Sequence, residues 1–160
     1  MEEQKSKIKL LIVDDEVKFL QSISERLKLK DFEVTTASDG SQAVKVAKRE
    51  KFDVAILDLK MPDMDGTEVM RILKKRHKFL QILILTGHAS IDSAVECTKL
   101  GAFNYIEKPY DFDNTSTSNL KDPLNFHLRL NHLLHHLFFI ILIKTNTYPT
   151  IRAELSWHGN

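Results

Sequence analysis

The feature that most constrains the fold is the order of apolar and amphipathic segments in the first 110 residues. Short apolar runs rich in β-branched residues alternate with segments whose apolar residues recur every three or four positions. The first kind of segment indicates strands and the second indicates amphipathic helices. Strands that alternate with helices predict an α/β fold with a parallel sheet covered by helices on both faces. We expect strands at residues 8–13, 32–37, 53–57, 81–85 and 103–106, and helices at 16–29, 38–50, 67–77 and 90–101.

Local signals support several of these segments. The unbroken apolar character of residues 8–13, 53–57 and 81–85 is typical of strands buried on both faces. In the last expected helix, Ser90 is placed to cap the start and Gly101 the end. In the first expected helix, apolar residues recur at helical spacing, at Val17, Leu20, Ile23 and Leu27.

Composition narrows the class of protein. The chain has 160 residues, 42% of them apolar and 28% charged, as in a soluble globular domain. A net charge of +1 provides no field for nucleic acid or an anionic membrane. The single cysteine, Cys97, excludes an internal disulfide and fits a reducing compartment. The apolar stretch near the N-terminus is too short for a signal peptide or a membrane span, so we expect a cytoplasmic protein.

Polar residues with matching chemistry follow the expected strands. Asp14 and Asp15 follow the first strand, Asp58 the third, Thr86 the fourth and Lys108 the fifth. In an open parallel sheet the carboxyl ends of the strands share one edge, which is where ligands bind. We therefore expect three carboxylates, a hydroxyl and an ammonium to converge on one small site.

The chemistry of this set points to phosphoryl transfer. Three clustered acids require a cation, and ligation by a few oxygens suits Mg²⁺. A carboxylate beside Mg²⁺ is a competent nucleophile toward phosphorus. The metal, the Lys108 ammonium and the Thr86 hydroxyl would neutralise charge on the phosphoryl oxygens. The sequence thus predicts that Asp58 attacks a phosphoryl group.

Residues 7–112 resemble the receiver domain of bacterial two-component response regulators. The segments LIVDDE, ILDLKMPDMDG, LILTGHAS and YIEKPY match that family's motifs in order and at suitable spacing. The resemblance implies a doubly wound, flavodoxin-like sheet of five parallel strands in the order 2-1-3-4-5. It also implies phosphorylation of Asp58 by a sensor histidine kinase or a phosphotransfer protein.

The resemblance assigns further roles. Mg²⁺ would be held by Asp15, the Asp58 carboxylate and the Lys60 backbone carbonyl, with Asp14 assisting. The other assignments are Thr86 and Lys108 as contacts of the phosphoryl oxygens, and Tyr105 as the aromatic residue that rotates inward when the domain switches. Such a domain catalyses only its own phosphorylation and dephosphorylation, and it signals through protein contacts.

The sequence departs from the family after residue 112. Receivers end in a fifth amphipathic helix, whereas residues 113–160 form an atypical tail in which helical periodicity is lost and charged residues fall from about a third to about a sixth. Residues 124–143 either form a late substitute helix, or the tail is not a native element of the fold. We interpret the histidines at 127, 132, 135 and 136 as incidental, since no acid or cysteine completes a zinc site. The tail carries no helix-turn-helix pattern, so we expect no direct DNA binding.

Two alternatives remain for the function. Asp63 and Asp65 lie in a DMDGT segment that spells the nucleophile motif of haloacid-dehalogenase-type phosphatases. That motif needs its first Asp directly on a buried strand tip, whereas here residues 60–62 intervene. The plainer interpretation makes both residues loop and cap residues of the helix near Thr67. The other alternative is a receiver-like scaffold that does not switch.

Overall fold

The computed structural model describes residues 7–108. Its five strands and four helices alternate as predicted, and most boundaries differ from expectation by one or two residues. The strands are β1 (Lys9–Val13), β2 (Glu33–Ala37), β3 (Val54–Leu57), β4 (Gln81–Thr86) and β5 (Asn104–Glu107). The helices are α1 (Val17–Lys28), α2 (Gly40–Ala47), α3 (Gly66–Arg76) and α4 (Ile91–Lys99).

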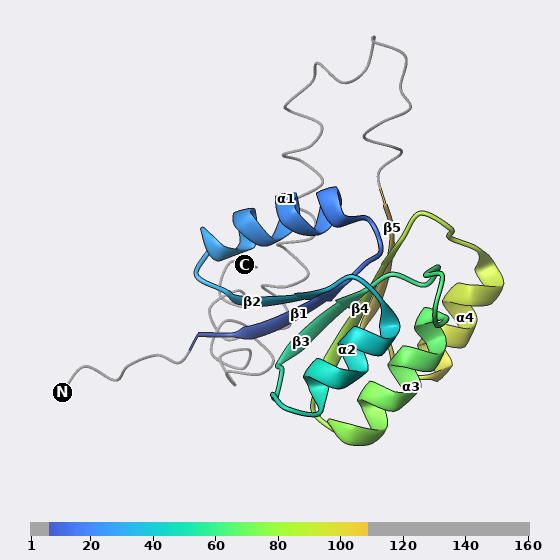
Figure 1. The fold of residues 1–160 in the computed structure, drawn as a ribbon. Coiled ribbons are helices and arrows are strands. Elements are labelled where there is room, and N and C mark those ends of the chain that lie inside the picture. Colours follow the sequence, from blue (N-terminus) through green and yellow to red (C-terminus); the bar gives the residue numbers. More distant parts are fainter. Residues whose placement is uncertain (1–6, 109–160) are drawn as a thin grey trace, which may run out of the picture. The chain divides into compact units, whose positions relative to one another are not determined.

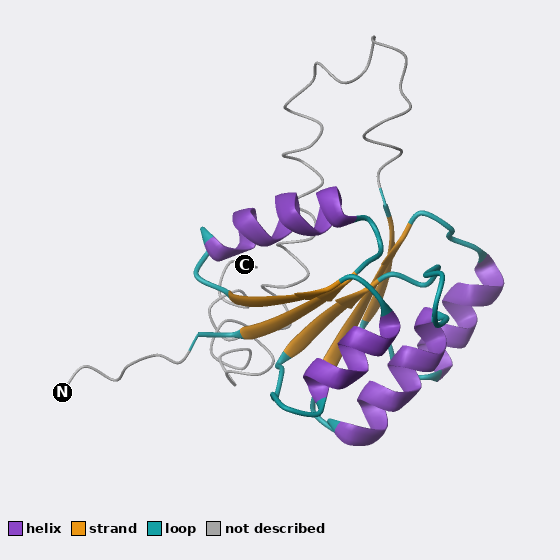
Figure 2. Cartoon of the chain, in the orientation of Figure 1, coloured by secondary structure: helices purple, strands orange, loops and turns teal. Residues whose placement is uncertain are grey.

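All strand pairs are parallel, and the strands lie in the order β2-β1-β3-β4-β5. Among the described residues, α1 covers one face of the sheet, and α2, α3 and α4 lie on the other (Figure 1). Figure 2 shows the same layers by type of element. The predicted doubly wound, flavodoxin-like fold is confirmed.

The core lies around the three central strands. Every residue of β3 is buried, and β1 and β4 are buried except for their first residues. The helices contribute apolar side chains at helical spacing, as Leu20, Ile23 and Leu27 do in α1. Val17, the first residue of α1, has the same helical spacing but is 66% exposed, so its side chain does not join the core.

The helix ends are fixed by hydrogen bonds. Ser90 caps α4, and its side chain exchanges bonds with Ser93 in a capping box. Gly101 follows the end of α4 with a φ of +88°, a conformation in which glycine avoids the cost that a Cβ would bring. Both predictions for this helix are confirmed.

Contacts between residues in space divide the chain into two compact units, Met1–Lys108 and Pro109–Asn160. The predictions for residues 113–160, including the substitute helix at 124–143 and the missing fifth helix, lie outside the described residues. Among residues 7–108, no helix is long and apolar enough to cross a membrane.

Candidate functional site

Strand register brings the predicted acids together. Val13 of β1 is paired with Leu57 of β3, and each is followed directly by an aspartate, Asp14 and Asp58. Both aspartates are buried, with exposed fractions of 2% and 4%. The next residue, Asp15, is exposed, yet one carboxylate oxygen from each of the three acids lies within 4.8 Å of the others. The predicted acidic cluster therefore exists at the carboxyl edge of the sheet.

Lys108 enters this cluster from β5. Its Nζ lies 2.8 Å from Oδ2 of Asp14 and 3.6 Å from Oδ2 of Asp58. The side chain is only 8% exposed. A buried ammonium of this kind requires nearby anions, because burial without them would cost several kcal/mol. One cation thus faces two buried carboxylates.

The protonation behaviour of the cluster reflects this burial. Burial raises the pKa of Asp14 to about 6, although the hydrogen bond and charge of Lys108 act in the opposite direction. Burial also lowers the pKa of Lys108, but the hydrogen bonds that its ammonium donates to Asp14 and Glu16, together with the charges of Asp14 and Asp58, outweigh burial, so the net pKa is raised. Lys108 therefore stays protonated, and its single positive charge faces a cluster of three carboxylates.

Thr86 ends β4 beside this cluster and is completely buried. Its Oγ1 accepts a hydrogen bond of 3.1 Å from the backbone N–H of His88, and its carbonyl accepts one of 2.8 Å from the N–H of Lys108. The bond from the Lys108 N–H holds the backbone of Lys108 beside the end of β4. Accepting from His88 leaves the hydroxyl proton of Thr86 for an oxygen in the site.

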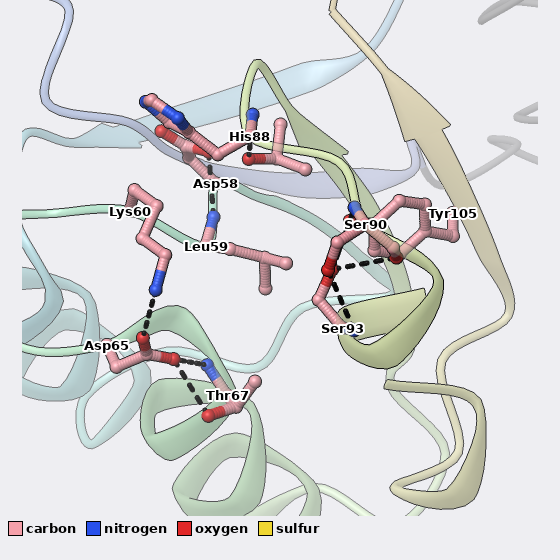
Figure 3. Close-up of polar contacts among 10 residues, drawn as sticks. Asp58, Leu59, Lys60, Asp65, Thr67, His88, Ser90, Ser93 and Tyr105 are labelled. Carbon is pink, nitrogen blue, oxygen red and sulfur yellow. Dashed lines mark hydrogen bonds and ion pairs between the residues drawn. The ribbon is translucent and has the colours of Figure 1, made fainter. Parts of the chain in front are cut away.

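The loop after Asp58 is held by close backbone contact. Oδ1 of Asp58 accepts a 2.7 Å bond from the N–H of Leu59, whose carbonyl accepts one of 2.8 Å from the N–H of Gly66. A Cβ at position 66 would lie 2.2 Å from the carbonyl oxygen of Asp58, so only glycine fits there. Figure 3 shows the Lys60 side chain directed away from Asp58 toward Asp65, with Nζ and Oδ2 3.3 Å apart.

Asp63 and Asp65 accept hydrogen bonds at the starts of two different helices. Asp65 caps α3, and its Oδ1 accepts bonds from the N–H and hydroxyl of Thr67. Asp63 instead accepts bonds from the N–H groups of Gly40 and Ser41 and from the Ser41 hydroxyl, at the start of α2. Asp65 is confirmed as the predicted cap and Asp63 as a loop residue before α3. The bonds that Asp63 accepts at the start of α2, whose N-cap is Asp39, were not predicted. Backbone donors fix both carboxylates outside the acidic cluster.

Tyr105 lies on β5 and is half-buried against the core. Its hydroxyl lies 2.7 Å from the Ser93 hydroxyl and 3.4 Å from the backbone N of Ser90, at the first turn of α4 (Figure 3). The residue predicted to be the switch aromatic is therefore linked to the capping box of that helix.

Two residues near Lys108 were missed by the sequence analysis. Oε1 of Glu16 lies 2.5 Å from Nζ of Lys108, and the Phe19 ring centroid lies 4.9 Å from it. Glu16 directly follows Asp14 and Asp15, and this run of three acids could have marked it as part of the site. Its partner is 92 residues away, however, and no local pattern identifies it.

The donor set fits a hard divalent cation. Three carboxylates supply oxygen atoms within a few ångströms of one another, and one ammonium is placed among them. Oxygen ligands of this kind, few in number and with one acid open to solvent, suit an ion that keeps part of its water shell. The acidic cluster is therefore a candidate site for such an ion.

Comparison with known proteins gives consistent results. A family model for the response regulator receiver domain matches residues 10–118. The transcriptional regulatory protein GlrR of Escherichia coli is 38% identical over 104 residues, which are 65% of this chain and 23% of that protein. The chain thus spans about a quarter of the length of the curated relatives that it matches.

Solved structures agree with the fold. A CheY-like receiver domain protein from Methanospirillum hungatei superimposes with a TM-score of 0.64 at 33% identity, covering 66% of this chain and 85% of that one. The response regulator TrrA of Thermotoga maritima, solved in complex with Mg²⁺-BeF, gives 0.58 at 31% identity, covering 66% and 90%. These matches fit the receiver hypothesis and not the phosphatase alternative. The chain belongs to the response regulator receiver domain family, the phosphoacceptor domains of two-component phosphorelays.

Proposed function

We propose that Asp58 is the residue that accepts the phosphoryl group in this chain, from a sensor histidine kinase or a phosphotransfer protein. The observation that carries the proposal is the position of Asp58: a buried carboxylate at a strand end, 3.6 Å from a buried ammonium and within 4.8 Å of two further acids. The donor would be a phosphohistidine, and the same site would accept a small acyl phosphate.

In the proposed step, a carboxylate oxygen of Asp58 attacks phosphorus and a phosphorus–oxygen bond forms. The bond between phosphorus and the donor's nitrogen breaks, and the imidazole leaves with the electron pair and takes up a proton. Lys108 would contact one phosphoryl oxygen and the Thr86 hydroxyl another, which stabilises the charge of the transition state. The N–H groups of Leu59 and His88 lie in the two loops that border the site.

We propose Mg²⁺ as the cation of the site. Asp15, the Asp58 carboxylate and the Lys60 carbonyl would hold it, with Asp14 assisting. When bound, it neutralises the acids and the incoming phosphoryl charge. The proximity of the three carboxylates supports this assignment.

Phosphorylation would act on Tyr105 through Thr86. A phosphoryl group brings roughly two negative charges and three acceptor oxygens. If the Thr86 side chain turns toward it, the Tyr105 ring gains space, and its hydroxyl changes its contacts with Ser90 and Ser93. The start of α4 and β5 would then present a different face to a downstream protein. The curated relatives are much longer proteins, and some are named transcriptional regulators.

The test is labelling with a small phosphodonor, followed by intact-mass measurement and mapping of the modified residue. We expect one phosphoryl group on the wild-type protein and on Asp65→Asn, none on Asp58→Asn, and none after chelation of Mg²⁺. Asp65→Asn is the matched control, because it changes an aspartate of the neighbouring loop. A label on Asp63 or Asp65 would contradict the proposal, and a folded, unlabelled wild-type protein would favour the scaffold alternative.

A further inference from the structure

The Lys108 ammonium has partners on two sides. Toward the interior it faces Asp14 at 2.8 Å and Asp58 at 3.6 Å. Its other contacts are the exposed Glu16 carboxylate at 2.5 Å and the half-buried Phe19 ring at 4.9 Å, from the residue before α1 and from α1. The ammonium is thus shared between the acidic cluster and a carboxylate that does not belong to that cluster.

The interior partners are the same carboxylates that the proposed function assigns to a divalent cation. Two positive charges that share one carboxylate within a few ångströms repel each other strongly at a buried site. The ammonium must therefore loosen its contact with Asp14 when a cation is bound. Because the Lys108 side chain is 8% exposed, it requires another acceptor in that state.

Glu16 is placed to be that acceptor. It is the N-cap residue of α1, and its backbone N–H donates a 3.0 Å bond to Oδ1 of Asp14, which fixes its position beside the cluster. Its side chain is 57% exposed, so its carboxylate is well hydrated without the cation. Phe19, one turn further along α1, supplies an aromatic face to the same ammonium.

We propose that Glu16 is a positioning residue that holds the Lys108 ammonium when a divalent cation takes Asp14 and Asp58, with the Phe19 ring as the second contact. The inference rests on the proposed function and deepens it, because it names a residue that makes cation binding and lysine placement compatible. Without Glu16, the ammonium stays on the interior acids and competes with the cation.

The test is a double-mutant cycle read as Mg²⁺ affinity by isothermal titration calorimetry. The proteins are wild type, Glu16→Gln, Lys108→Met and the double variant. We expect Glu16→Gln to weaken Mg²⁺ binding about threefold to fivefold more in the wild-type background than in the Lys108→Met background, since removal of the lysine also removes the competitor. Glu25→Gln is the matched control: it removes a carboxylate from the same helix that contacts Gln21, and we expect no change in affinity.

Equal weakening in both backgrounds would mean simple attraction between Glu16 and the metal, and it would overturn the inference while leaving the proposed function intact. Unchanged or tighter binding by Glu16→Gln would also overturn it. Failure of every protein to bind Mg²⁺ would instead overturn the metal assignment of the proposed function, and the inference with it.

A second variant covers the case in which Lys108→Met does not fold. Phe19→Leu changes no charge. If Glu16 acted only by attracting the metal, this substitution would leave the Mg²⁺ affinity unchanged. The inference predicts weaker binding, by about twofold, because the ammonium loses its aromatic contact. An unchanged affinity in a folded Phe19→Leu protein would contradict the inference.

Discussion

Two neighbouring regions of this molecule are rich in aspartate and use it in opposite ways. In the acidic cluster, Asp14 and Asp58 are buried at strand ends and share one ammonium. In the loop that follows β3, Asp63 and Asp65 lie near the surface and accept hydrogen bonds from helix N-termini. The residue type is the same, and Asp58 is only a few residues from Asp63 in the sequence, but the environments differ.

The difference lies in what satisfies each carboxylate. Backbone N–H groups and the helix dipole stabilise the ionised form of the loop aspartates, and this stabilises the fold. Asp14 and Asp58 each accept a backbone N–H bond as well, from Glu16 and Leu59. At Asp14, however, burial outweighs that bond and raises the pKa, so its charge costs stability when no divalent cation is bound. The proposed function thus uses negative charge that the fold leaves incompletely neutralised.

The largest effect should come from removing a charge from the cluster. Without divalent cations, Asp14→Asn should raise the free energy of unfolding at pH 8 by up to about 3 kcal/mol, because burial raises the pKa of Asp14 from 3.8 to about 6. Urea denaturation measures this change. The gain should shrink as the pH falls from about 6 and vanish well below pH 3.8, where the wild-type carboxyl is protonated in both states. A variant less stable than the wild type at pH 8 would contradict the comparison.

An intermediate effect of the opposite sign is expected in the loop. Asp65→Ala removes the N-cap of α3, including the bonds from the N–H and hydroxyl of Thr67, and should lower the free energy of unfolding by about 1 kcal/mol. Phosphoryl labelling of Asp58 should persist in this variant. Stability equal to the wild type in the same urea titration would show that the cap contributes nothing.

The smallest effect concerns pH. Hydrogen bonds from the N–H groups of Ser41 and Gly40 lower the pKa of Asp63 from 3.8. A lowered folded-state pKa means that this contribution is present above pH 3.8 and is lost as the pH falls through the folded value. The stability difference between wild type and Asp63→Asn should therefore shrink below about pH 4.

For Asp14 the pH dependence has the opposite sign. The free-energy cost of its buried charge grows as the pH rises from 3.8 through about 6. Thermal unfolding of both variants across pH 3–8 would separate the two trends.

Much of this architecture could be predicted from the sequence, because it follows from periodicity and strand ends. Alternating apolar and amphipathic segments determined the α/β layers, and the residues after the strands identified Asp14, Asp58, Thr86 and Lys108 as neighbours. The prediction failed where contacts are not local. Neither the position of Asp63 at the start of α2 nor the exposure of Val17 leaves a pattern in the segment that contains it.

By itself the sequence determined which groups stand at the carboxyl edge of the sheet, because side-chain chemistry and strand order are properties of the chain. Tertiary structure alone decided how those groups share their charge. The distances from Lys108 to Asp14, Glu16 and Asp58, and the burial that raises the pKa of Asp14, arise from pairing between strands and from the position of α1. Electrostatic energies depend on separation and on exclusion of water, and neither quantity is encoded in any short segment.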